Sequence, residues 1–380
     1  MHRPTLAHTF AERLPDMVAE VVPTDFPNPQ VAVLNEPLAA ELGIETEWLR
    51  TAEGTAWLAG SSGGHATAYA GHQFGQFVPL LGDGRALLLG DIDGREIQLK
   101  GSGRTPFSRP GSDGRGAIGP MLREHLVSEF MHAVGIPTTR SLAVVATGEH
   151  VIRQQGRVPG GILVRVATSH LRVGSVQYAA TQSPALVEEV IRAAGFDTPL
   201  ELLNTVVDRQ LGLVAQWMRI GFVHGVMNTD NTALSGETID YGPCAFTEDF
   251  DLSAVFSSID TAGRYAFGNQ PSIIAWNLAR LAEAMFPLLD LDAAREVFAS
   301  IQSRWDELWA RQQESGPEVP LFLPRNRMLQ DALNAAEAGG DYAPYRALLA
   351  AVTDPYNPEA GPEWMTRPEE SGPFTTYCGT

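Results

Sequence analysis

The sequence predicts an α+β protein of two lobes, β-rich in its N-terminal part and mainly helical in its C-terminal part. Between residues 73 and 167, short apolar runs alternate with Gly-containing turns, which is typical of antiparallel strands. From residue 183 onwards, apolar side chains recur at helical spacing. The 380 residues also exceed the length that one hydrophobic core usually supports.

These patterns divide the chain into four expected segments. The first is an extension with short helices, one of which is capped by Asn35 and closed by Gly43. A β-rich lobe, a helical lobe and a flexible tail rich in Pro and Gly follow. The expected boundaries are 1–66 for the extension, 67–178 for the β-rich lobe, 179–353 for the helical lobe and 354–380 for the tail.

Composition excludes several classes of protein. A content of 44% hydrophobic and 19% charged residues is that of a folded globule. The net charge of -18, without a basic stripe, disfavours nucleic-acid and anionic-membrane partners. No apolar run reaches the roughly 18 residues of a membrane span, so we expect a cytoplasmic protein. Two cysteines, Cys244 and Cys378, are too few for a disulfide scaffold or a structural zinc site.

The β-rich part begins with an expected three-stranded meander. Its runs QFVPLL, ALLLGDI and EIQLK are separated by two Asp-Gly turns. The glycines of the first turn, Gly82 and Gly84, let backbone N–H groups approach an anion, and Arg85 adds charge; such turns are also common in plain hairpins. We expect further strands at TRSLAVVAT, HVIRQ and GGILVRVA, with turns at Gly148 and Gly156.

Lys100 ends the third of these strands and is the only lysine in the chain. A helix is expected over residues 118–134, and it carries Glu124 at the edge of its apolar face. A strand Lys paired with a helix Glu is how protein kinases hold phosphates. The competing interpretations are a solvated Lys100 and a surface pair of Glu124 with Arg123 or Arg115.

Arginines surround this pair in the sequence. A loop after Lys100, too long for a plain connection, carries three arginines and the Asp113-Gly114 dipeptide. Arg165 and Arg172 follow the last predicted strands; they act either as phosphate clamps or as solvated side chains. In the helical part we expect helices from Ser183-Pro184 and from Thr198-Pro199, then four more at residues 269–286, 291–309, 327–339 and 341–352.

The chain is organised around residues 224–243, HGVMNTDNTALSGETIDYGP. If Leu234 and Ile239 pair across a short turn, Asp240 returns to the neighbourhood of Asn231. A carboxylate and an amide oxygen converging there suit Mg²⁺ or Mn²⁺, and the adjacent Asp230 remains as a base. The alternative is an ordinary polar turn. The order of helix, polar loop, two short strands and Asp is similar to that of protein kinases, which however separate the base Asp from the metal-binding Asn.

Eight short motifs occur in a fixed order along the chain: AGHQFGQF, GDGR, IQLKGSGRTPFSR, DGRGA, RVATSHLR, HGVMNTDN, TIDYGP and GRYAFGNQP. Over roughly residues 25 to 290 the sequence resembles the selenoprotein O family of kinase-like protein adenylyltransferases. The resemblance implies a protein-kinase-like fold, ATP bound in a flipped orientation, and transfer of AMP to protein hydroxyls.

The resemblance also implies roles for individual residues. Asp230 corresponds to the proton acceptor, and Asn231 and Asp240 to the metal ligands, with Asp240 also reaching ATP through the metal. Lys100 corresponds to the ATP lysine and Glu124 to its ion-pair partner. The other implied nucleotide contacts are Gly82, Gly84, Arg85, Asp113, Gly114, Arg165 and Arg172.

The chain departs from the family pattern in four places. Ser112 is an insertion beside Asp113, and the region after Trp305 is short. Phe256 stands where members often carry a Cys, and Cys378 represents the family's C-terminal Cys or selenocysteine. A regulatory disulfide between Cys244 and Cys378 is a hypothesis that follows from this comparison.

We therefore expect an Mg²⁺- or Mn²⁺-dependent enzyme that transfers AMP from ATP to Ser, Thr or Tyr hydroxyls of proteins, with the chain itself among the candidate acceptors. Three alternatives stay open: UMP transfer from UTP, a conventional kinase that moves the γ-phosphoryl group, and a non-catalytic ATP-binding pseudokinase. The kinase needs the same Lys, Glu, Asp and Asn set, so the residues alone do not separate it from the adenylyltransferase.

Overall fold

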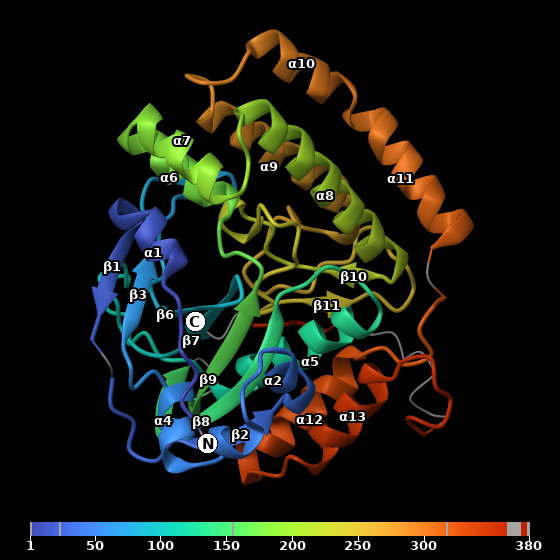
Figure 1. Ribbon diagram of the computed structural model, residues 1–380. Coiled ribbons are helices and arrows are strands. Elements are labelled where there is room, and N and C mark those ends of the chain that lie inside the picture. Colours follow the sequence, from blue (N-terminus) through green and yellow to red (C-terminus); the bar gives the residue numbers. More distant parts are fainter. Residues whose placement is uncertain (1, 23, 154–155, 317, 363–373, 378–380) are drawn as a thin grey trace.

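A seven-stranded antiparallel sheet forms one end of the molecule, and a group of helices forms the other (Figure 1). The computed structural model describes residues 2–22, 24–153, 156–316, 318–362 and 374–377. The sheet order is β1-β3-β6-β7-β9-β8-β2. The strands are β1 (Val18–Val21), β2 (Gln30–Leu34), β3 (Gly64–Thr67), β6 (Ala86–Ile92), β7 (Arg95–Lys100), β8 (Arg140–Arg153) and β9 (Gly156–Ala167).

Residues 1–66 contribute more to this sheet than the sequence predicted. Their helices are short, as expected: α1 (Thr9–Arg13), η1 (Pro15–Met17), α2 (Glu36–Glu41), α3 (Thr46–Leu49) and α4 (Ala52–Leu58). Asn35 accepts a hydrogen bond from the Leu38 amide at 3.1 Å and so caps α2. The two edge strands β1 and β2, however, also come from this segment. β1 and β2 were not predicted, because each is too short to show the alternation of apolar and polar residues that is typical of a strand.

The three-stranded meander expected from the sequence was wrong in its first strand, which does not belong to the large sheet. β6 and β7 pair as an antiparallel hairpin, and β6 pairs on its other side with β3. The run QFVPLL instead begins with β5 (Gln76–Val78), which pairs only with β4 (Gly71–Gln73) in a separate hairpin. A second correction concerns Gly148, which is not a turn but lies at an irregularity within the continuous strand β8, at φ 77°.

Helices cover both faces of the large sheet. On one face, α2 to α4 bury Leu38, Trp48 and Trp57 against side chains of β7 and β8 such as Leu99 and Val145. On the other face, α5 (Ile118–Ala133) packs along β8 and β9. This helix runs almost where the sequence placed it, and its buried position brings Glu124 beneath the sheet.

The helical part is built around the long helix α8 (Pro199–Arg219). Two differences from prediction appear here. α6 (Val173–Gln182) is a helix that was not predicted, and residues 291–309 form two helices separated at Ser300. The other elements are α7 (Pro184–Ala193), β10 (Phe222–Val223), η2 (Thr229–Asn231), β11 (Ala245–Phe246), η3 (Phe267–Asn269), α9 (Gln270–Ala284), α10 (Leu291–Ala299) and α11 (Ile301–Ser315).

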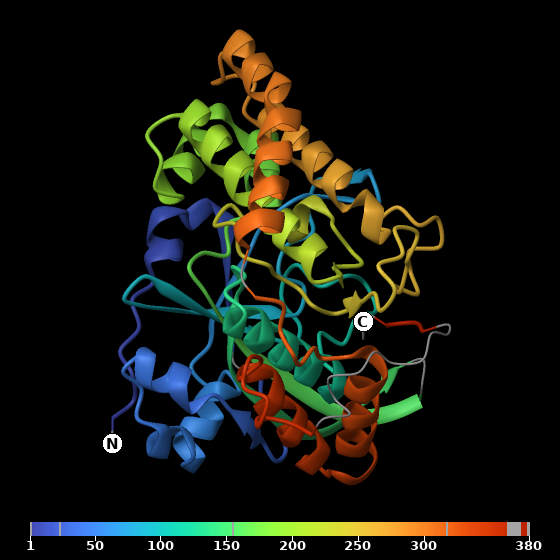
Figure 2. The same cartoon turned by 90° about the vertical axis from the view of Figure 1, so that its right-hand side faces the viewer.

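The last two helices do not join this group. α12 (Asn326–Gly339) and α13 (Ala343–Thr353) pack on α5, at the sheet end of the molecule and away from α10 and α11 (Figure 2). Tyr345 of α13 is fully buried there, and its hydroxyl donates to the Leu122 carbonyl at 3.1 Å. These two helices therefore lie apart from the group around α8. Within the ranges that the structure describes, no helix is both long enough and apolar enough to cross a membrane.

Candidate active site

Four charged side chains meet between the sheet and the helical part. Lys100, at the end of β7, donates to Glu124 Oε2 of α5 at 2.6 Å and to Asp240 Oδ1. Arg165 of β9 donates through Nε to Glu124 Oε1 at 3.0 Å. The Lys100, Glu124 and Arg165 side chains are at most 8% exposed, whereas that of Asp240 is 31% exposed. We call these four residues the ion cluster.

The ion cluster holds its carboxylates in the charged form. Burial by itself raises the pKa of Asp240, but Lys100 and Arg165 outweigh burial and leave the pKa far below its ordinary value. For Glu124, burial is likewise outweighed by Arg165 and then Lys100, so its pKa is also lowered. The sequence left several ion-pair partners open for Glu124, and in the structure Glu124 pairs with Lys100.

Hydrogen bonds through the neutral amide of Gln98 connect the ion cluster to Asp83 and the sheet. Gln98 of β7 accepts from Arg165 at 3.2 Å and donates to Asp83 at 3.1 Å. Asp83 in turn accepts from the amide and hydroxyl of Thr67 in β3 at 2.9 and 2.7 Å. These partners immobilise the Arg165 guanidinium, so the positive charge is preorganised.

The route that brings Asp240 to the cluster differs from the predicted hairpin. Leu234 and Ile239 do not pair with each other. Ala233 bridges to Arg172, and Thr238 bridges to Thr138, so the two arms attach to different neighbours. Asp240 then adopts a left-handed conformation at φ 67°, which aims its carboxylate at Lys100.

Asp230 lies in the short helix η2 and is 9% exposed. Its Oδ1 is buried and has no hydrogen-bond partner among the described residues. Burial, opposed by its own backbone amide and Arg172, raises the pKa of Asp230 to about 6. At neutral pH the carboxylate is therefore mostly ionised, yet basic enough to accept a proton.

The β4–β5 hairpin positions Asp230. A Cβ on Gly71 would lie 2.5 Å from Asp230 Oδ1, so only glycine allows this close approach. The His72 amide donates to Thr229 Oγ1 at 2.7 Å, and the Phe74 amide donates to Asn228 Oδ1 at 3.0 Å. The loop that carries Asp230 is thus tied to the hairpin by both preceding residues.

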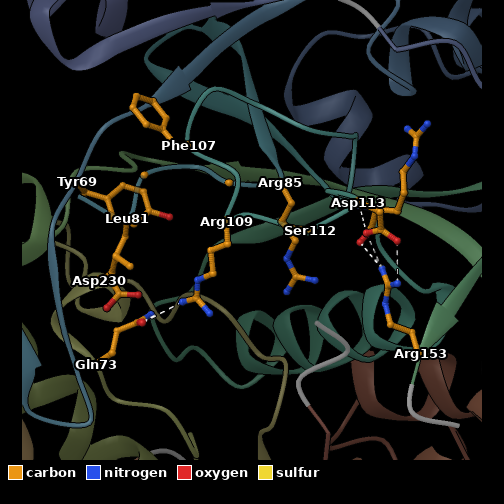
Figure 3. Close-up of a pocket in the computed structure, with 13 residues that line it drawn as sticks. Tyr69, Gln73, Leu81, Arg85, Phe107, Arg109, Ser112, Asp113, Arg153 and Asp230 are labelled. Atoms are coloured by element: carbon orange, nitrogen blue, oxygen red, sulfur yellow. Dashed lines mark hydrogen bonds and ion pairs between the residues drawn. The ribbon is translucent and has the colours of Figure 1, made fainter. Parts of the chain in front are cut away.

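A cavity of about 220 Å³ opens beside Asp230 (Figure 3). Asp230 and Gln73 lie at one end of it and Asp113 with Arg153 at the other, with Arg85 and Arg109 between them. Its further lining residues are Tyr69, Leu81, Gly82, Gly84, Phe107, Ser112 and Arg115. A glycine turn, arginines and an aromatic ring around one cavity are suited to an anionic ligand with a ring system.

Nine of the predicted site residues thus fall into two adjacent groups. Gly82, Gly84, Arg85, Asp113 and Asp230 line the cavity, whereas Lys100, Glu124, Arg165 and Asp240 form the ion cluster. The groups influence each other, because Arg85 lowers the pKa of Asp240 and Asp240 raises that of Asp230.

Three predicted residues lie outside both groups. Asn231 donates from Nδ2 to the Val226 carbonyl at 3.0 Å, which fixes its amide and leaves Oδ1 as an acceptor. Arg172 donates to the Asp230 carbonyl at 3.1 Å, and its buried Nη2 has no partner in the described ranges. Gly114 lies at φ 69° against Gly103, where a Cβ would come within 2.3 Å of backbone. Among the described residues, no hydrogen bond joins Asn231 directly to Asp240.

Sequence reasoning did not single out Tyr69, Phe107 and Arg153. Tyr69 stacks under the Arg172 guanidinium at 4.3 Å, and Phe107 packs against Gly82. Arg153 binds Asp113 through Nη1 at 2.9 Å and Nη2 at 3.2 Å. Phe107 lies in the motif IQLKGSGRTPFSR, and Tyr69 immediately precedes the motif AGHQFGQF, so these motifs could have indicated both residues.

Cys244 follows the TIDYGP segment and is 2% exposed, and burial raises the pKa of its thiol to about 12. We predict that a maleimide at pH 7 to 8 leaves Cys244 of the folded protein unmodified, because almost no thiolate is present and the sulfur is covered. Peptide mapping before and after denaturation checks this, and rapid native labelling of Cys244 would contradict it. Cys378, the other half of the hypothetical disulfide, lies outside the described residues.

Comparison with known proteins decides the family. The sequence profile described as "Protein adenylyltransferase SelO" matches residues 4–315. The chain belongs to this family. It is 42% identical over 478 positions to "Protein nucleotidyltransferase YdiU" of Mycolicibacterium smegmatis, covering 99% of this chain and 98% of that protein. A protein of the same name from Rhodopseudomonas palustris is 57% identical over 373 positions, covering 90% of this chain and 75% of the relative.

The family identifies the chain as a protein nucleotidyltransferase, which has a nucleotide and a protein as its substrates. The third relative, "Protein nucleotidyltransferase YdiU" of Cereibacter sphaeroides, is 42% identical over 480 positions, with 98% of this chain and 99% of the relative covered. These alignments are about a hundred positions longer than the 380 residues present here, so the chain is internally shorter than such relatives.

Proposed function

We propose that the protein transfers AMP from ATP to Ser, Thr or Tyr hydroxyls of proteins and releases pyrophosphate. The observation that carries this proposal is Asp230, a buried carboxylate with an unpartnered oxygen at the wall of a cavity lined by glycines and arginines. Asp230 accepts the proton of the acceptor hydroxyl as that oxygen attacks the α-phosphorus of ATP. The bond from the α-phosphorus to the bridging oxygen breaks, and pyrophosphate leaves.

The ion cluster and the nearby arginines neutralise the phosphates. Lys100, oriented by Glu124, and Arg165 supply positive charge on the ion-cluster side. Arg172 adds a guanidinium whose Nη2 has no partner among the described residues. Because these groups are fixed before the reaction, they stabilise developing charge without reorganising. Gly82, Gly84, Arg85, Asp113 and Gly114 complete the proposed nucleotide contacts.

Asn231 and Asp240 would hold a Mg²⁺ or Mn²⁺ ion. The donor set fits, since Asn231 Oδ1 is an available acceptor and Asp240 stays ionised. No group of three or more His, Cys, Asp or Glu side chains with metal-binding geometry occurs in the described residues, so phosphate oxygens and water would provide the remaining ligands. Such an ion would offset the charge of the triphosphate.

The fold fits this reaction as well. We propose that the sheet with α5 corresponds to the N-terminal lobe of a protein kinase and α6 to α9 to its C-terminal lobe, with the boundary near residue 178. Lys100 on a sheet strand, Glu124 on the helix behind it, and Asp230 and Asp240 after a long helix support this correspondence.

ATP labelled at either the α or the γ phosphorus tests the proposal. Wild-type protein incubated with Mg²⁺ or Mn²⁺ and a protein extract should transfer label from α-labelled ATP only. Label from the γ position alone would identify a conventional kinase and overturn the proposal. ATP-dependent thermal stabilisation without any labelled product would identify a pseudokinase. Parallel reactions with α-labelled UTP distinguish AMP from UMP transfer.

Substituting Asp230 by Asn should lower kcat of protein labelling by about 10² to 10⁴, because the general base is lost while the side-chain shape is kept. In the wild type, kcat/KM should fall as pH decreases through about 6, because the protonated carboxyl cannot accept the hydroxyl proton. Asp292→Asn, at an exposed position on α10, is the matched control and should retain full activity. A rate for Asp230→Asn within threefold of wild type would remove Asp230 from the mechanism.

A further inference from the structure

The outer face of the β4–β5 hairpin carries aromatic and cationic side chains that the proposed reaction does not use. The His72 ring lies 4.9 Å from that of Phe77 and 5.1 Å from that of Trp276 on α9. The guanidinium groups of Arg264 and Arg280 lie 4.9 and 4.8 Å from the Trp276 ring. We call these five residues the hairpin cluster.

The hairpin cluster has an excess of positive charge. Arg280 pairs with Glu283 one helical turn away at 2.5 Å, but no carboxylate in the described ranges lies within ion-pair distance of Arg264. The buried Nε atoms of both arginines lack a hydrogen-bond partner there as well. Burial is the largest cause of the lowered pKa of His72, and the positive charges of Arg280 and Arg264 lower this pKa further. Both guanidinium groups therefore lie close to the His72 ring. In a chain of net charge -18, this is a local exception.

The hairpin cluster lies next to the proposed reaction centre. Successive side chains of β4 point to opposite faces, so Gln73 lines the cavity with Asp230 (Figure 3) while His72 faces the cluster. The His72 amide donates to Thr229 Oγ1 at 2.7 Å, and Thr229 immediately precedes Asp230. Phe77 and Leu80 of the same segment are 46% and 50% exposed. A surface of exposed apolar side chains and unbalanced positive charge thus borders the Asp230 cavity, one strand away.

We propose that the hairpin cluster docks the acceptor protein by binding an acidic side chain that lies a few residues from the modified hydroxyl. This inference rests on the proposed function. An acceptor hydroxyl must reach Asp230, and an extended segment advances roughly 3.3 Å per residue, so its near neighbours in sequence pass over the hairpin. The Arg264 guanidinium attracts a carboxylate there, and Phe77 and Leu80 contact an apolar neighbour. Charges at such a rim mainly determine which partner is selected.

A peptide array with α-labelled ATP tests the proposal. Each peptide contains one Ser, Thr or Tyr, with Glu, Ala or Lys placed in turn at each of the four positions on either side. Wild-type protein should label at least one Glu-containing set about fivefold more than its Lys counterpart. Arg264→Glu should abolish or invert this preference. Arg295→Glu reverses the charge of a 77% exposed arginine on α10 and should behave as wild type.

Two further measurements keep the outcomes distinct. The rise in melting temperature on adding ATP should be the same in Arg264→Glu and wild type; loss of this rise would show that the cluster serves the nucleotide and would overturn the docking role. If Arg264→Glu does not fold, Arg280→Glu replaces it and should weaken the same preference. Labelling of peptides without regard to flanking charge would overturn the docking proposal alone. Absence of labelling on every peptide and every protein would overturn the proposed function, and the docking role with it.

Discussion

Replacing Asp240 by asparagine should lower kcat/KM for protein labelling by about 10³-fold or more, the largest loss that we expect from a single substitution. The amide keeps the shape of the side chain but removes the charge that faces Lys100 and Arg165 and would bind the metal ion. Preorganised charge usually contributes more to catalysis than a general base, so this loss should exceed that of Asp230→Asn. Initial rates with α-labelled ATP at saturating Mg²⁺ and Mn²⁺ measure it.

Asp93 supplies the matched control for this experiment. Like Asp240, it adopts a left-handed backbone conformation, at φ 48°, but it lies exposed in the β6–β7 turn. Asp93→Asn should therefore keep wild-type kcat/KM. Activity of Asp240→Asn within tenfold of wild type at every Mg²⁺ and Mn²⁺ concentration would refute the role of Asp240 in metal binding.

Lys100→Met should both abolish ATP-dependent stabilisation and destabilise the fold by about 3 to 5 kcal/mol, because it removes one partner of a buried ion pair. Lys100 is 8% exposed and bridges two carboxylates, which would be left with Arg165 as the nearest remaining cation of the cluster. Urea denaturation measures the free energy of unfolding, and thermal melts with and without ATP measure binding.

Arg95→Met is the control within the same strand. Arg95 begins β7, and its half-exposed side chain pairs with Glu41 at 3.1 Å. Surface pairs of this kind contribute about 0 to 1 kcal/mol, so its loss should change stability little and ATP binding not at all. If Lys100→Met and Arg95→Met lowered the free energy of unfolding equally, the ion cluster would contribute no more to stability than a surface ion pair.

Much of the architecture could be predicted from the sequence. The predictions that were wrong have common causes. β7, α5 and α8 were predicted well because local signals mark where each begins or ends: the Asp-Gly turn before β7, Gly135 after α5 and Thr198-Pro199 at the start of α8. The pairing of Leu234 with Ile239 was wrong because both arms form backbone hydrogen bonds to other segments, Leu234 to Leu171 and Thr238 to Pro137. Local turn chemistry cannot reveal a competing partner that lies far away in the chain.

The edge strands and the last helices show the same limit. β1 and β2 are only four and five residues long, so each becomes a strand through its neighbour in the sheet. α12 and α13 have ordinary amphipathic patterns that predict a buried face but not the helix that covers it. In the structure that helix is α5, about two hundred residues earlier in the chain.

The sequence by itself determined the chemical inventory: one lysine at a strand end, a helical glutamate 24 residues later, and the Asp230, Asn231 and Asp240 set. These are local patterns that can be identified from short segments of a few residues. Only the tertiary structure decided the partners, pairing Lys100 with Asp240 across 140 positions and Arg165 with Glu124 across 41. The physical reason is that a buried charge takes the partner that folding places within reach, and this reach is a property of the packed elements.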